Sequence, residues 1–224
     1  VISITKNIKK KIMYESLLEA TKYHAANPEH WVGEALAEYK HNIFSIIKQN
    51  NIKSILDYGC GKAKFHPILF NNIKLPGSPM DINITPYDPA VPQYSTKPNS
   101  KYDLVICIDV MEHVQEDKVE EVLQDIFNYS NRVFLTITCY EATQVLTNGK
   151  NAHYTIKEPD WWKENLKPHD GSYVVIFQTK RDRGGKTINK EEWKPNAETV
   201  KKLENPKKFV KTLDESQIEK AKLL

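Results

Sequence analysis

The sequence predicts an α/β fold in which helices cover both faces of a mostly parallel, doubly wound sheet. Between residues 33 and 138, segments that favour strands alternate with segments that favour helices, and such alternation is typical of parallel sheets with right-handed crossovers. The apolar run at 102–109 indicates a central strand buried on both faces. A Gly-x-Gly turn directly after another apolar strand supports the same class.

The first half of the chain supplies helices and short strands in turn. Residues 5–26 favour a polar helix that ends before a proline. Residues 33–49 carry apolar side chains at intervals of three and four, which predicts an amphipathic helix. Residues 54–58 predict a short buried strand that ends at two glycines, and residues 62–73 favour a helix. Residues 82–87 predict a second strand that ends at an Asp-Pro pair.

The second half continues the alternation. The run at 102–109 precedes an amphipathic helix whose apolar face comprises Val119, Val122, Leu123, Ile126 and Phe127. Residues 133–138 and 173–178 predict two further strands. Beyond Lys180 the pattern weakens, and we expect only weakly helical, lysine-rich chain there.

The net charge is small and unevenly distributed. Thirty-two basic and 29 acidic residues leave a formal charge of +3. From Lys180 onward there are 13 basic and 8 acidic residues, whereas the preceding chain has 19 and 21. This lysine excess is typical of a solvated tail, with an anionic partner as the alternative. The chain has only three arginines, which weighs against sequence-specific DNA reading because arginine forks dominate that recognition.

Cysteine usage and hydropathy indicate a cytoplasmic protein. Cys60, Cys107 and Cys139 are widely separated, which argues against disulfides and a zinc ribbon and fits a reducing compartment. No segment has the ~18 apolar residues of a membrane span. The chain starts with a short apolar stretch before basic residues, the opposite order to a signal peptide. We expect no metal site and no membrane association, and the sequence leaves the oligomeric state open.

Three predicted strand ends carry residues that suit a ligand site, because open parallel sheets bind ligands at the carboxyl ends of their strands. The segment 57–61 reads Asp-Tyr-Gly-Cys-Gly, and its glycines permit a tight turn and close backbone approach to a ligand. Asp88 follows the second strand, where a carboxylate can accept hydrogen bonds from ribose hydroxyls. Asp81 is the rival for that role, and simple turns are the alternative for both ends. The third strand end begins at Asp109.

Two common phosphate-binding motifs do not fit the glycine turn. The dinucleotide motif needs a small residue where this chain has Lys64, and no Gly-Lys-Ser/Thr follows at the spacing of a P-loop. The pattern that does fit is Asp-x-Gly-x-Gly-x-Gly, with Ala63 in the last position.

Together, the three segments resemble those of class I S-adenosylmethionine-dependent methyltransferases. The Asp57-Tyr-Gly-Cys-Gly turn, Asp88 and the DLVICIDVMEHV run follow one another in that family's order and spacing over about residues 50–140. The resemblance implies a Rossmann-like fold, S-adenosylmethionine as the cofactor and S-adenosylhomocysteine as its product. The 13 residues between Asp88 and Tyr102 are too few for the family's usual helix and third strand. We therefore expect a reduced or altered third strand, or an extended lid, at that point.

The resemblance implies cofactor contacts at all three strand ends. The glycine turn would surround the methionine part, the acid after the second strand would bind the ribose, and the third end would lie near the reactive methyl group. The implied cofactor-binding residues are Asp57, Gly59, Gly61, Tyr87, Asp88, Pro89, Asp109, Val110 and Met111. Glu112 and His113 follow directly and would face the substrate, with a structural hydrogen bond as the alternative for His113.

A substrate-binding segment is predicted at residues 148–165, which are similar to segments of bacterial and phage methyltransferases. A histidine beside Asn and Tyr, followed by adjacent tryptophans, predicts an aromatic substrate wall with one base, and packing of a short helix is the alternative for the tryptophans. The candidate bases are His113 and His153, because an imidazole titrates near neutral pH. The candidate substrate-binding residues are Glu112, Tyr154, Trp161 and Trp162.

We expect three regions in the chain. Residues 1–50 would form a helical extension that closes over the cofactor as a lid, residues 51–180 the methyltransferase domain, and residues 181–224 a lysine-rich extension.

The predicted reaction is in-line displacement at the sulfonium methyl group, with O- or N-methylation of a small-molecule or glycan acceptor. Asp109-Val-Met-Glu stands where DNA amino-methyltransferases have Asp/Asn-Pro-Pro-Tyr/Phe, and no Pro-Cys nucleophile is present. The alternatives are a nucleic acid or nucleotide acceptor bound through the C-terminal lysines, and a non-catalytic cofactor-binding scaffold. A phage-encoded protein would act in the host cytoplasm.

Overall fold

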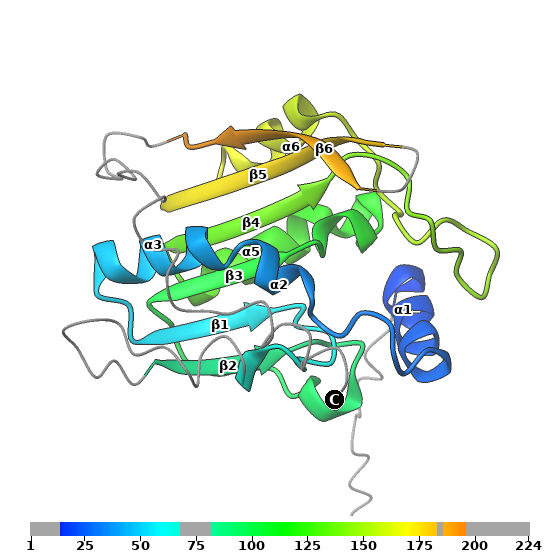
Figure 1. The fold of residues 1–224 in the computed structure, drawn as a ribbon, viewed down its shortest axis with the longest axis horizontal. Coiled ribbons are helices and arrows are strands. Elements are labelled where there is room, and N and C mark those ends of the chain that lie inside the picture. Colours follow the sequence, from blue (N-terminus) through cyan, green and yellow to red (C-terminus); the bar gives the residue numbers. More distant parts are fainter. Residues whose placement is uncertain (1–13, 68–81, 183–185, 196–224) are drawn as a thin grey trace, which may run out of the picture.

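A computed structural model describes residues 14–67, 82–182 and 186–195. Within them, six strands form one sheet in the order β2-β1-β3-β4-β5-β6 (Figure 1). The first five strands are parallel and β6 is antiparallel to β5. In chain order the strands are Ser54–Tyr58, Asn83–Tyr87, Leu104–Ile108, Arg132–Thr138, Ser172–Arg181 and Thr187–Trp193. The predicted mostly parallel α/β fold is confirmed.

Helices cover both faces of this sheet. Helices α2 (Ala35–Glu38) and α3 (Lys40–Asn50) cover one face, where Leu36 of α2 and the isoleucines of α3 pack against β1, β3, β4 and β5. Helices α5 (Val119–Tyr129) and α6 (Pro159–Leu166) cover the other face. Successive strand residues alternate between these two cores, as Val105 and Ile106 do, because side chains of a strand point to opposite faces. Figure 1 shows α3 and α5 on opposite sides of the sheet.

The strand order reverses at β1, which lies between β2 and β3. Within the described residues, the chain between β2 and β3 contains a single 3-10 turn at Pro92–Tyr94 and no strand. The expected alteration of the third strand is therefore confirmed. Such a reversal leaves a crevice at the carboxyl ends of the two flanking strands, which is where parallel sheets of this kind bind ligands.

Helix α1 (Glu15–Ala26) does not pack on either face of the sheet. It lies beyond the strand ends toward which the arrows of β1, β3 and β4 point (Figure 1). This helix is polar, as residues 5–26 predict, and residues 5–13 lie outside the described part of the chain. None of the described helices is long and apolar enough to cross a membrane.

Three segments of the chain differ from the sequence prediction or lie partly outside the described residues. The helix expected at 33–49 breaks at Tyr39, which separates α2 from α3. Half of the helix expected at 62–73, residues 68–73, lies outside the described residues. Strand β6 occupies part of the region expected to be weakly helical, so the sheet continues beyond residue 180 to Trp193. Its side chains are mostly exposed because it is an edge strand, and an apolar pattern is therefore missing.

Candidate functional site

The turn after β1 brings backbone close to its neighbours at two glycines. Gly59 and Gly61 have φ angles of +80° and +56°, a region that favours glycine. A Cβ atom on Gly59 would lie 2.3 Å from Cγ2 of Val110, and one on Gly61 would lie 2.2 Å from the carbonyl oxygen of Trp31. Both positions therefore require glycine for space as well as for conformation.

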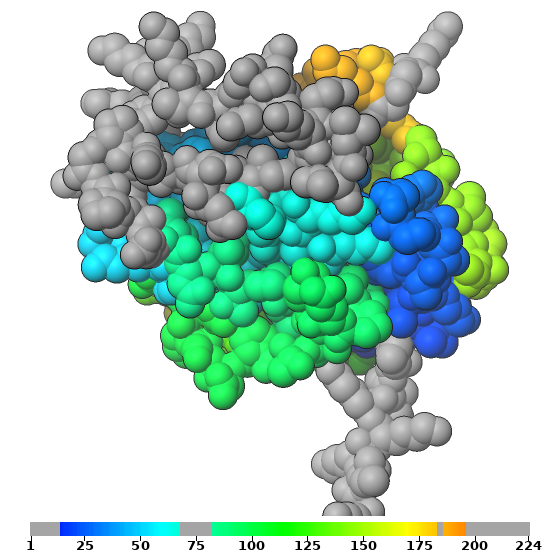
Figure 2. Space-filling view, turned by 60° about the horizontal axis from the view of Figure 1, so that its bottom comes forward, coloured from blue at the N-terminus to red at the C-terminus, as the bar shows by residue number. Residues whose placement is uncertain are grey.

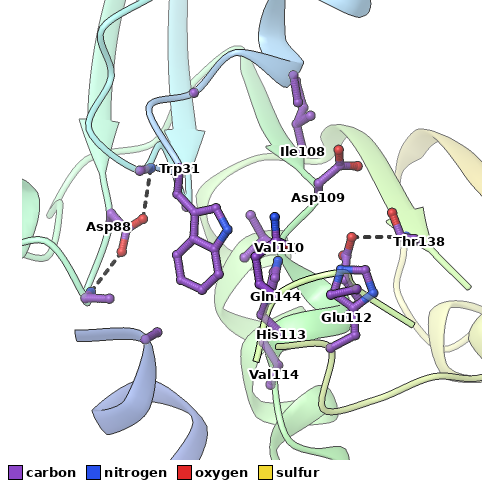
Figure 3. Close-up of a pocket in the computed structure, with 18 of the residues that line it drawn as sticks. Trp31, Asp88, Ile108, Asp109, Val110, Glu112, His113, Val114, Thr138 and Gln144 are labelled. Carbon is purple, nitrogen blue, oxygen red and sulfur yellow. Dashed lines mark hydrogen bonds between the residues drawn. The ribbon is translucent and has the colours of Figure 1, made fainter. Parts of the chain in front are cut away.

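Asp88 lies beside this turn and is held by two backbone groups. Its Oδ2 accepts a hydrogen bond from the Gly61 amide at 2.9 Å, and its Oδ1 accepts one from the Ala90 amide at 2.8 Å (Figure 3). Burial raises the pKa of Asp88 to about 6, against the opposing effect of these two bonds. Each carboxylate oxygen keeps a further lone pair for a ligand hydroxyl.

Asp109 follows β3 in an unusual conformation. Its φ of +53° is rare for a residue with a side chain and is common at functional sites. Its Oδ1 accepts hydrogen bonds from Thr136 Oγ1 and Gln178 Nε2, both at 2.6 Å. Burial raises the pKa of Asp109 to about 6. The neighbouring strands β4 and β5 thus fix this carboxyl group in place.

Glu112, His113 and His153 form a compact cluster on the other side of Asp109. Glu112 is fully buried and its Oε1 accepts a hydrogen bond from the Thr138 amide at 3.2 Å (Figure 3). Burial, assisted by the nearby Asp109, raises the pKa of Glu112 well above its usual range. Burial lowers the pKa of His113 to about 3 and also lowers that of His153. Both imidazoles are therefore neutral at neutral pH.

The N-terminal segment is bound directly to the glycine turn. The carbonyl oxygens of Trp31 and Val32 accept hydrogen bonds from the amides of Lys62 and Lys64 at 3.1 and 3.0 Å. The Lys62 ammonium donates to the carbonyl oxygen of His30 at 2.6 Å. The Trp31 ring lies 4.9 Å from that of His113 and stands between Asp88 and Val110 in Figure 3. Residues before α2 thus cover the strand ends.

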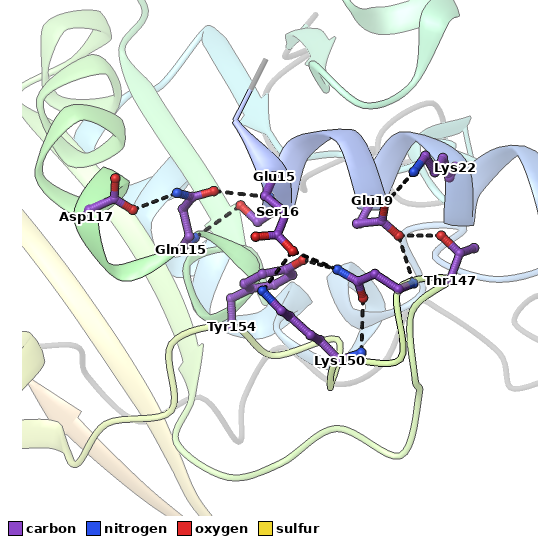
Figure 4. Close-up of polar contacts among 10 residues, drawn as sticks. Glu15, Ser16, Glu19, Lys22, Gln115, Asp117, Thr147, Lys150 and Tyr154 are labelled. Carbon is purple, nitrogen blue, oxygen red and sulfur yellow. Dashed lines mark hydrogen bonds and ion pairs between the residues drawn. The ribbon is translucent and has the colours of Figure 1, made fainter. Parts of the chain in front are cut away.

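Helix α1 is joined to the segment that follows β4. The Glu19 carboxylate accepts hydrogen bonds from the Thr147 hydroxyl and, at 3.2 Å, from the Asn148 amide (Figure 4). Glu15 forms an ion pair with Lys150 at 2.8 Å. Figure 2 shows the blue helix beside the yellow-green segment, which agrees with these contacts. Two segments distant in sequence therefore close the site together.

The glycine turn, Trp31 and the three strand ends line one cavity of about 660 Å³, which is within the usual range for small-molecule sites. Among the described residues, its lining contains several carboxyl groups but a single arginine and no lysine. Histidines aside, the acidic and basic lining residues are Glu34, Glu38, Asp88, Asp109, Glu112 and Arg181, and the raised pKa of Glu112 favours its neutral form. The cavity therefore favours a cationic ligand over an anionic one.

A comparison with protein families now identifies this arrangement, because the family model for a methyltransferase domain matches residues 29–173. The chain belongs to the methyltransferase domain family. The match includes the glycine turn, Asp88, the end of β3 and the 140–158 segment. No curated protein matches the sequence. The protein is accordingly an S-adenosylmethionine-dependent methyltransferase that yields S-adenosylhomocysteine.

The residues at this methyltransferase's strand ends fit the cofactor. The turn at Gly59 and Gly61 has no room for side chains, as a backbone cradle requires, and the doubly anchored Asp88 can accept ribose hydroxyls. The excess of carboxylates suits the positive sulfonium and ammonium groups of S-adenosylmethionine. Of the residues implied for the cofactor, the cavity is lined by Gly59, Gly61, Asp88, Pro89, Asp109 and Val110.

Three residues implied for the cofactor lie away from the cavity surface, contrary to the expectation of direct contact. Asp57 is buried and its Oδ2 lies 2.5 Å from Nε2 of His66, which explains its position behind the turn. Tyr87 is buried with its ring against that of Tyr58. Met111 is fully buried in the core beneath α5.

Of the residues predicted to bind the substrate or act as a base, some line the cavity and others do not. Glu112, His113 and His153 line the cavity. Trp162 is fully buried in the core, Trp161 is partly buried against that core, and neither lines the cavity, which favours the alternative of a packed helix. Tyr154 accepts a hydrogen bond from Asn148 beside α1, outside the cavity lining.

Several polar residues at this site were missing from the sequence prediction. Thr136 and Gln178 orient Asp109, and Thr138 binds Glu112 through its amide. Their signal in the sequence is polarity near the carboxyl ends of otherwise apolar strands. Which strand ends become neighbours depends on strand order, and that order is a tertiary property.

Proposed function

We propose that this methyltransferase acts on a hydroxyl or amine group of a small-molecule or glycan acceptor. The observation that carries the proposal is the charge of the cavity, with five carboxyl groups and one arginine among its described lining residues. A nucleic acid entering such a cavity would bring phosphates close to these carboxylates, and like charges repel. A neutral or cationic small molecule meets no such barrier.

The covering of the site supports the same acceptor class. Helix α1 joins the 140–154 segment through Glu19 and the chain after β3 through Ser16, which exchanges hydrogen bonds of 3.1 and 3.2 Å with Gln115 (Figure 4). A cover of this kind excludes water from a reaction between small reactants. It also limits access for a bulky double helix.

The chain's own residues have modest chemical tasks in this reaction. S-adenosylmethionine supplies a methyl group that its sulfonium already activates, so alignment and exclusion of water are the main requirements. Asp88 and the glycine turn would hold the cofactor, and the cluster at Glu112 would face the acceptor. The neutral rings of His113 and His153 present Nε2 lone pairs, each of which can accept a hydrogen bond from an acceptor hydroxyl.

The test is methyl transfer by the full chain from labelled S-adenosylmethionine. We expect label in small hydroxylated or aminated compounds or glycans and none in tRNA or duplex DNA. Asp88→Asn should reduce the affinity for S-adenosylhomocysteine about tenfold or more, since bonds to a charged group contribute about 1.5–3 kcal/mol. Asp160→Asn, at an exposed helix position, is the matched control. Efficient and specific labelling of nucleic acid would refute the proposed acceptor class.

The nucleic acid alternative makes a different prediction. It requires the lysines of the C-terminal extension, of which residues 196–224 lie outside the described part of the chain. In that case, transfer to RNA or DNA should decrease steeply with salt and with removal of those residues.

A further inference from the structure

The cluster of Glu112, His113 and His153 has the composition of a metal site. One possible ligand atom from each residue lies within 4.8 Å of the other two. Glu112 and His113 come from the 3-10 turn after β3 (Met111–His113), and His153 comes from the segment after β4. Sequence alone predicted no metal site because these residues are 40 positions apart and follow no metal-binding spacing.

Both histidines are oriented as metal ligands usually are. Nδ1 of His113 lies 2.8 Å from the carbonyl oxygen of Ala152, and Nδ1 of His153 lies 2.6 Å from that of Tyr140. A carbonyl oxygen only accepts, so each Nδ1 carries the hydrogen and each Nε2 keeps a lone pair. A histidine that binds a metal typically donates its other ring N–H to a carbonyl in this way. The two rings are nearly perpendicular, with centroids 4.9 Å apart.

The Glu112 carboxylate supplies independent support. The residue is fully buried, and only one of its oxygens is bonded, to the Thr138 amide. The other, Oε2, is buried and has no hydrogen-bond partner among the described residues. An isolated buried carboxylate oxygen is costly unless a cation or donor satisfies it. Since Glu112 lines the cavity beside both histidines, a cation bound there would satisfy it.

We propose that Glu112, His113 and His153 bind a divalent transition-metal ion, with Zn²⁺ and Mn²⁺ as the best candidates. Two imidazoles and one carboxylate suit these ions, whereas Mg²⁺ and Ca²⁺ prefer sites made of oxygen ligands. Asp109 is not counted as a ligand, because Thr136 and Gln178 already bind one of its oxygens. Three protein ligands leave at least one coordination position open, as in catalytic metal sites.

The open position indicates a role for the ion, and this part of the inference rests on the proposed methyl transfer. An acceptor hydroxyl bound at that position would have a lowered pKa and would lose its proton to solvent. Its oxygen would form the new bond to the methyl carbon, while the electron pair of the broken carbon–sulfur bond stays on sulfur. The acceptor atom would then be oxygen, and the product an ether.

Metal binding can be measured without any knowledge of the acceptor. Full-length protein is treated with a chelator, exchanged into metal-free buffer and titrated calorimetrically with ZnCl₂ and separately with MnCl₂. We expect one ion per chain. Glu112→Gln and His153→Asn should each weaken binding about 10- to 100-fold or more. His41→Asn removes a histidine from α3, outside the cluster, and should leave it unchanged.

Binding of S-adenosylhomocysteine by each metal-free variant separates the possible failures. Retained cofactor binding with lost metal binding supports the cluster. If a variant fails to fold, Co²⁺ absorption and X-ray absorption of the unmodified protein show whether two nitrogen ligands and one carboxylate surround the ion. The proposal is overturned if neither ion binds at millimolar concentration, or if the variants bind as tightly as the unmodified protein. If the unmodified protein did not bind S-adenosylhomocysteine at all, that result would instead refute the methyltransferase function.

Discussion

Replacing Gly61 with alanine tests the close contact between the glycine turn and the N-terminal segment. The new Cβ would lie 2.2 Å from the carbonyl oxygen of Trp31, so backbone must move on one side or the other. Any such shift also disturbs the Gly61 amide, which donates to Asp88 at 2.9 Å. We therefore expect Gly61→Ala to lower both stability and cofactor affinity.

The magnitude follows from two contributions. A positive φ of +56° costs an alanine about 1–2 kcal/mol. Displacement of packed neighbours adds about 1–3 kcal/mol. Together these give about 2–5 kcal/mol, which corresponds to a decrease in Tm of about 5–15 °C for a chain of this size. Gly149→Ala is the matched control, because Gly149 has a φ of +81° but no atom within 4 Å of its added Cβ.

Thermal unfolding and calorimetric titration with S-adenosylhomocysteine measure the two effects. Gly149→Ala should show only the conformational cost of about 1–2 kcal/mol and bind the cofactor product normally. Gly61→Ala should lose more stability and at least about tenfold in affinity, since a bond to a charged carboxylate is weakened. Equal destabilisation by the two substitutions, or unchanged affinity in Gly61→Ala, would refute the inferred contact.

Three further predictions concern the same site. Burial raises the pKa of Asp88 to about 6, so between about pH 4 and 6 the folded carboxyl keeps a proton that the unfolded one has released. The contribution of Asp88 to the unfolding free energy of the cofactor-free protein should therefore decrease as the pH rises across this window. In urea titrations, Asp88→Asn should remove this contribution and leave those of the other buried carboxyl groups, Asp109 and Glu112. A pH dependence identical to that of the unmodified protein would contradict this. Gly59→Ala should weaken S-adenosylhomocysteine binding about tenfold because its Cβ would lie 2.3 Å from Val110. In calorimetry, the double variant Gly59→Ala/Val110→Ala should recover part of the affinity, and no recovery would exclude that clash as the cause. Glu19→Gln should weaken the contact of α1 with Thr147 and Asn148 and lower the affinity for S-adenosylhomocysteine about three- to tenfold. Amide exchange at residues 147 and 148 should become faster, and unchanged exchange would argue against this contact.

The sequence located the strand ends that carry the predicted cofactor residues because the signals for those ends are local. Gly59 and Gly61 follow directly from a buried strand, and Asp88 directly follows the next one, so short-range patterns place them at strand ends. The same reasoning was less successful for Asp57, whose carboxyl group turns to His66. Which way a side chain points at a strand end depends on its neighbours in space, and sequence spacing does not give that information.

On the acceptor side of the site, the strongest local signals in the sequence did not indicate where the side chains lie. The adjacent tryptophans of α6 gave a strong local signal for a substrate wall, whereas the helix packs Trp162 into the core and Trp161 against it. Strand β6 was missed because an exposed edge strand has no apolar alternation, while its backbone pairing with β5 stabilises it.

The sequence by itself determined the α/β class, the altered third strand and the methyltransferase resemblance, because apolar periodicity and glycine turns act over a few residues. The tertiary structure decided which distant residues meet. It brought His153 to Glu112 and His113, it placed carboxyl groups from five positions around one cavity, and it joined α1 to the 140–154 segment. Those contacts depend on strand order and on packing across the ends of the sheet, and local patterns do not encode either one directly.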